Sequence, residues 1–123
     1  MNAFDRAIAA HSAALQRVAG YDVVIKRGPR ESETIVGVLS SSTHEVYDEA
    51  EQIATKVKFS DWLFTKSELI LAGKALTPKQ GDLIVATIRE VERTFKVVPI
   101  EKRPCFEPHD ASGLMVIVHT IEL

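Results

Sequence analysis

The stretch TPKQGDLIVATIREVERTFKVVP, residues 77–99, decides the fold that this sequence predicts. A turn-forming pair, Gly81 and Asp82, stands before an apolar run rich in β-branched residues, and a second such run follows it. Pro78 fixes φ ahead of the turn, Gly81 can adopt a positive φ, and the Asp82 side chain can accept hydrogen bonds from nearby backbone amides. The stretch therefore predicts a corner that leads into one strand and then into a second.

Segments of the same character recur along the chain, separated by turns that contain Gly or Pro. Because β-branched and aromatic residues favour extended backbone, each segment predicts a strand. The predicted strands are residues 21–27, 33–40, 53–64, 82–88, 93–100 and 114–123. This order predicts a mainly β fold over residues 21–123, a small antiparallel β-barrel or β-sandwich that closes or stacks to bury its apolar faces.

Residues 1–19 follow a helical period instead. Phe4, Ile8 and Leu15 recur near helical spacing with alanines between them, and Gly20 stands where a helix would end. The segment therefore predicts an N-terminal α-helix with one apolar side. Phe4, Ile8 and Leu15 on that side are candidates for an interface, either with the barrel itself or with another subunit.

One long inter-strand loop is predicted over residues 41–52. The segment holds more residues than a hairpin turn needs, and its charged side chains are all acidic. Its acidic residues are Glu45, Asp48, Glu49 and Glu51, with Val46 and Tyr47 among them. We therefore expect a long, mobile, acidic loop.

Length and composition predict a single domain over residues 1–123. Hydrophobic residues make up 46% of the 123 residues, which is ample for one core in a chain too short for two ordinary domains. A net charge of -2 leaves no broad basic surface for nucleic-acid phosphates. A nucleic-acid-binding small β-barrel is the alternative, although Lys56, Lys58 and Lys96 alternate with apolar residues as solvated strand positions do.

Catalytic or metal-binding chemistry has little support in the sequence. Cys105, His109 and Asp110 could serve as nucleophile, base and orienting group, or as metal ligands, but a structural zinc site needs four ligands. We therefore expect no catalytic residue, no metal and no cofactor, and a small enzyme or ligand-binding barrel is a further alternative. Cys105 is the one cysteine, and no apolar run is long enough to span a bilayer, so we expect a soluble intracellular protein.

The sequence resembles a known family from residue 58 onward. The order KFSDWLFTKSELILAGKALTPKQGDLI, then TFKVVP, then DASGLMVIVHT is similar to the small head-tail joining proteins of tailed bacteriophages and prophages, also called head-tail connector, head completion or stopper proteins. The residues that carry the resemblance are Asp61, Trp62, Leu63, Leu69, Leu71, Ala72, Gly73, Pro78, Gly81, Asp82, Ile84, Phe95, Val97, Pro99, Asp110, Gly113, His119 and Thr120.

The resemblance implies a structural protein of the virion neck, assembled in the host cytoplasm. Such a protein forms a ring with copies of itself, commonly a hexamer, with dodecamers at neighbouring positions. The ring would join the portal or adaptor protein of the head to the tail terminator or tail tube protein, and would help to close or gate the DNA channel. DNA would only pass through it, and no membrane would take part.

Two sets of residues acquire roles from this resemblance. The acidic loop is expected to project into the ring's channel, because acidic side chains repel DNA phosphates, while a solvated outer loop is the alternative reading. The channel candidates are Glu45, Val46, Tyr47, Asp48, Glu49 and Glu51. Trp62 is expected either in the core or at a subunit boundary where its indole N–H would find a partner.

Overall fold

The computed structural model describes residues 20–48, 53–100, 104–109 and 113–123, and of residues 42–48 and 53–55 the backbone alone. The helix predicted over residues 1–19 lies outside the described residues. Within them, the chain is mainly strand, with one short 3-10 helix, so the predicted mainly β class is confirmed. No helix in these ranges is long and apolar enough to span a membrane.

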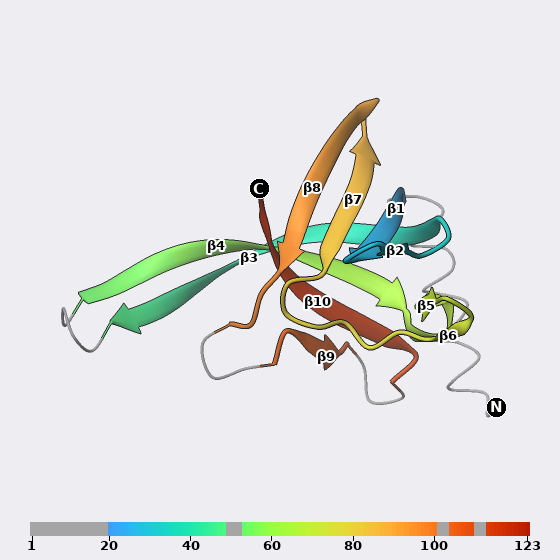
Figure 1. The fold of residues 1–123 in the computed structure, drawn as a ribbon. Helices are drawn as coiled ribbons and strands as arrows, with labels where there is room; N and C mark the ends of the chain where they lie inside the picture. Colours follow the sequence, from blue (N-terminus) through green and yellow to red (C-terminus); the bar gives the residue numbers. More distant parts are fainter. Residues whose placement is uncertain (1–19, 49–52, 101–103, 110–112) are drawn as a thin grey trace, which may run out of the picture.

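In the described residues, ten strands and the 3-10 helix follow one another (Figure 1). They are β1 Gly20–Arg27, β2 Arg30–Glu31, β3 Ile35–Asp48, β4 Ile53–Thr65, η1 Lys66–Glu68, β5 Ile70–Leu71, β6 Lys74–Ala75, β7 Leu83–Ile88, β8 Val91–Val97, β9 Phe106–Pro108 and β10 Met115–Glu122. Most of the long strands lie close to the segments that the β-branched runs predicted, although β8 begins two residues earlier than residue 93 and β3 continues to Asp48, well beyond the predicted residues 33–40.

Six of these strands close into an antiparallel barrel, which selects the barrel over the sandwich. The order around it is β1, β3, β4, β10, β8, β7 and back to β1. The closing pair is β1 with β7, in which Ile25 lies opposite Ile84 and both side chains are buried. Because the strands pair in a circle, each of the six barrel strands has a partner strand on both sides. Strand β2 pairs with β1, and β9 pairs with β10.

The barrel core is built around three aromatic residues without solvent exposure. The Trp62 ring lies 5.2 Å from the Phe95 ring, edge to face, and 6.2 Å from the Phe64 ring in a stacked arrangement. Gly37 of β3 faces this cluster, since a Cβ built there would lie 2.6 Å from Phe64 Cε1 and 2.8 Å from Trp62 Cε3. A side chain at position 37 would therefore displace the aromatic rings.

Strands β3 and β4 continue well past the barrel as a two-stranded hairpin. Their pairing runs without a break from Val38 opposite Leu63 to Asp48 opposite Ile53. Figure 1 shows this hairpin projecting away from the other strands. Here the structure differs from the predicted long loop, because residues 41–48 extend β3, and only residues 49–52 lie outside the description. We call residues 41–48 and 53–59 together the β3–β4 arm.

Candidate functional site

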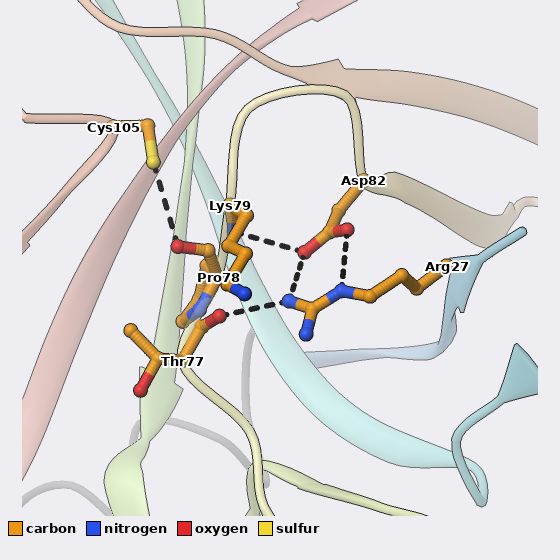
Figure 2. Close-up of polar contacts among 6 residues, drawn as sticks. All are labelled: Arg27, Thr77, Pro78, Lys79, Asp82 and Cys105. Carbon is orange, nitrogen blue, oxygen red and sulfur yellow. Dashed lines mark hydrogen bonds and ion pairs between the residues drawn. The ribbon is translucent and has the colours of Figure 1, made fainter.

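The predicted corner is stabilised by a charged pair of two residues that lie 55 positions apart in the sequence, Arg27 and Asp82 (Figure 2). Asp82 is buried and accepts hydrogen bonds from Arg27 Nε at 2.9 Å and from Arg27 Nη2 at 2.7 Å. It also accepts the backbone N–H of Lys79 at 2.9 Å, as the sequence predicted for an aspartate in this turn. Gly81 has φ of +95°, so the prediction of a positive φ is confirmed. The hydrogen bonds from Arg27 therefore fix the corner to the end of β1.

The same arginine reaches back to the connection before the corner. Arg27 Nη2 donates to the carbonyl of Thr77 at 2.8 Å, and the two-point contact with Asp82 raises the pKa of the guanidinium further above its usual value. On the other side of the connection, the thiol of Cys105 donates to the carbonyl of Pro78 at 3.5 Å. Burial raises the pKa of this thiol, which leaves it less reactive than a free cysteine.

A second polar cluster ties β10 to the strands on either side of it. His119 is almost fully buried, with Nδ1 at 2.9 Å from an Asp61 carboxylate oxygen of β4 and Nε2 at 2.9 Å from a Glu107 carboxylate oxygen of β9. His119, one of the residues that carry the resemblance, therefore has a hydrogen-bonding partner at each ring nitrogen. Each ring nitrogen of His119 thus faces one carboxylate, and the tautomer of the ring decides which nitrogen donates its N–H.

Several other described residues of the resemblance take structural positions. Trp62 lies in the core of its own subunit, with no hydrogen-bond partner for its indole N–H among the described residues. Leu69 is also core, and Thr120 is buried with its hydroxyl donating to the Ser60 carbonyl. Gly73 and Gly113 both have positive φ. These residues hold the barrel together and expose no reactive group.

The channel and interface candidates are only partly described. Glu45, Val46, Tyr47 and Asp48 form the far end of β3, and Glu49 and Glu51 lie outside the described residues. The interface candidates Phe4, Ile8 and Leu15 also lie outside them. The structure therefore brings four of the six channel candidates to one end of the β3–β4 arm.

Of Cys105, His109 and Asp110, which the sequence supports only weakly as a catalytic or metal-binding group, the structure describes the first two. Cys105 contacts the Pro78 carbonyl, and the exposed His109 donates its backbone N–H to Met115, while Asp110 lies outside the described residues. In the part of the chain that the structure describes, no group of three His, Cys, Asp or Glu side chains is placed to hold a metal ion.

Sequence reasoning missed three residues that organise these sites. The sequence around Arg27 predicts only the end of a strand, and its partner Asp82 is 55 residues away. Glu107 has the pattern of a solvated residue in a proline-flanked segment, and its sequence neighbours do not indicate that it contacts His119. Gly37 gave a signal, because a glycine inside a strand often marks the close approach of another group.

The comparisons with known proteins point to one family. The family described as "Phage head-tail joining protein" matches the chain over residues 1–123, its whole length. A search of curated proteins found no significant match. The family match thus extends the resemblance seen from residue 58 onward to the first half of the chain.

Proposed function

The chain belongs to the phage head-tail joining protein family, and we propose that it acts as a ring in the virion neck, between the portal or adaptor side of the head and the tail. Family membership itself supports a structural role in the phage neck and a place in the virion. The observation that carries the proposal is the family match over residues 1–123. The ring, its partners and its action on the DNA channel are the parts that we add.

The architecture suits a ring subunit. A closed barrel supplies a rigid body, and the β3–β4 arm supplies an extension that can reach beyond it. Head-to-tail contacts repeated around an axis close into a ring when the rotation permits, and they need complementary patches but no reactive group. The resemblance favours a hexamer, with a dodecamer as the other stoichiometry.

We assign the far end of the β3–β4 arm to the DNA channel. Glu45 and Asp48 lie in the last four residues of β3, and Glu49 and Glu51 follow directly in sequence. Acidic side chains repel the phosphate backbone, whereas each lysine or arginine contact would gain free energy from counterion release and hold the DNA. An acidic constriction therefore allows DNA to be retained by a narrow opening and later to slide.

Native mass spectrometry of the purified protein, alone and with portal-bearing heads, tests the ring. We expect a single closed stoichiometry, six or twelve copies, either in solution or on the heads. Electron microscopy of the same sample should show a ring with a central opening. A protein that stays monomeric in both samples contradicts the ring, and retention of duplex DNA at moderate salt would favour the nucleic-acid-binding alternative.

A further inference from the structure

The β3–β4 arm has two edges that no described strand covers. Strand β1 pairs with β3 only as far as Val38, and β10 pairs with β4 only as far as Ser60. Beyond these points, the two strands of the arm pair with each other alone. A two-stranded ribbon is marginally stable by itself, and a free strand edge is a template for another strand.

The registers show which backbone groups point outward. Lys66 donates its backbone N–H to the Leu114 carbonyl, so the even-numbered residues of β4 direct their N–H and C=O groups toward the β10 side. The unbroken β3–β4 register then directs the odd-numbered residues of β3 toward the opposite side. In the arm, the outward groups belong to Ser41, Thr43, Glu45 and Tyr47 on β3 and to Ala54, Lys56 and Lys58 on β4.

The two strands of the arm carry opposite charges. Residues 41–48 contain Glu45 and Asp48 and no lysine or arginine. Residues 53–59 contain Lys56 and Lys58 and no acidic residue. Placing a β3 edge beside a β4 edge therefore brings opposite charges together across the new strand pair, whereas pairing two like edges brings like charges together.

We propose that arms of neighbouring copies pair edge to edge, with β3 of one copy hydrogen-bonded to β4 of the next. If all arms point the same way, this contact continues the antiparallel alternation, because β3 and β4 run in opposite directions. Each copy offers one edge of each kind, so the contact is head-to-tail and can repeat around a ring. The inference rests on the proposed ring and names the surface that builds it, a sheet formed by the arms.

Two proline variants test this pairing, one for each edge. Thr43→Pro removes an outward N–H of β3, and Lys56→Pro removes an outward N–H of β4, so neither removes a hydrogen bond within the arm. Each variant alone should lose the ring and run as a monomer. An equal mixture should give a dimer with one copy of each variant and nothing larger, because only one intact edge of each kind remains.

Matched controls separate the backbone effect from the side-chain effect. Thr43→Val and Lys56→Arg keep the N–H and should assemble as the wild type does. Folding of the barrel is followed by the fluorescence of Trp62, the single tryptophan, which is fully buried outside the arm. As a measurement without substitutions, hydrogen exchange on the wild type should show the amides of Thr43 and Lys56 slowed in the ring relative to the dilute monomer.

The outcomes distinguish this inference from the proposed ring. Rings formed by either folded proline variant, or no gain in amide protection in a wild-type ring, overturn the edge pairing and leave the ring intact. A mixture that stays monomeric while the wild type assembles overturns the head-to-tail pairing. A wild type that never assembles, even on portal-bearing heads, overturns both.

Discussion

At the scale of single residues, the barrel depends on a few polar side chains that join distant parts of the sequence. Asp82 is 4% exposed, while its partner Arg27 retains 31% of its side-chain exposure. A carboxylate buried to this degree costs free energy unless it is paired and hydrogen-bonded. The corner that introduces β7 is therefore stable because Arg27 reaches it from the end of β1.

Replacing Arg27 with alanine should lower the free energy of unfolding by about 2 kcal/mol. This loss is smaller than the loss on breaking a fully buried ion pair, because water can reach part of the site. The Asp82 charge would keep only the Lys79 amide among its described partners. Urea unfolding followed by Trp62 fluorescence measures the effect. Once Asp82→Ala has removed the carboxylate, the further change Arg27→Ala should cost much less. Full stability of Arg27→Ala would contradict the account of the corner.

At the scale of elements, the turn of the β7–β8 hairpin has a backbone conformation that its two residues do not favour. Its two turn residues, Arg89 and Glu90, have φ of 51° and 67°, which are the positive values of a type I′ turn. Neither residue is one of the Asn, Asp or Gly types that adopt this conformation readily. The strand pairing around the turn, rather than the turn itself, therefore fixes this conformation.

Replacing Arg89 and Glu90 with Asn and Gly should stabilise the protein by about 1 kcal/mol, because the turn would then suit its residues. Chemical denaturation of the double variant against the wild type measures this gain. Ala-Ala at the same positions is the control, and it should give no comparable gain. An Asn-Gly variant that is less stable than the wild type would show that the side chains of Arg89 and Glu90 contribute more than the turn conformation costs.

The contact between β8 and β10 should make stability depend on pH. Arg93 donates two hydrogen bonds to the Glu122 carboxylate, which lowers the pKa of Glu122 below its ordinary 4.5. A carboxylate with a lowered native pKa contributes its full stability above the ordinary value, and the contribution is lost as pH falls through the native value. The difference in urea midpoint between the wild type and Glu122→Gln should therefore shrink with acidification below pH 4.5. A difference that grows in acid would contradict the pairing.

The strands could be predicted from the sequence where burial leaves a pattern. Runs of β-branched residues around Val23, Ile84 and Val118 produced strands because these side chains face a core. Residues 41–48 lack such a run, so the sequence suggested a loop, whereas in the structure their backbone pairs with β4 as a strand. The partners of Asp82 and His119 could not be predicted, since pairing over a long separation depends on how the barrel closes.

At the scale of the whole molecule, the closed barrel supplies the rigid body and the arm supplies the surface proposed for assembly. The six barrel strands pair in a closed circle, while the arm extends beyond it and offers exposed backbone with which copies can join. In the proposed ring, the paired strands of the arms would form an inner sheet and their acidic ends would face the DNA. The same segment would then serve both assembly and control of the channel.

Replacing Glu45, Asp48, Glu49 and Glu51 with lysine should slow DNA ejection, because the new cations would bind phosphates as DNA passes. The matched control replaces the same four residues with glutamine, which removes repulsion without adding attraction. Ejection from assembled particles, measured by release of DNA over time at several salt concentrations, should be slowest for the lysine variant at low salt. Unchanged retention and ejection in complete particles would place this segment outside the channel.

Head-tail joining in particles made without this protein tests the central claim most directly. A phage that lacks the functional gene should produce DNA-filled heads and separate tails, and addition of the purified protein should restore joined particles and infectivity. The proline variants of the arm should fail to restore them. Normal tailed, infectious particles formed without the protein would contradict a structural role in the neck.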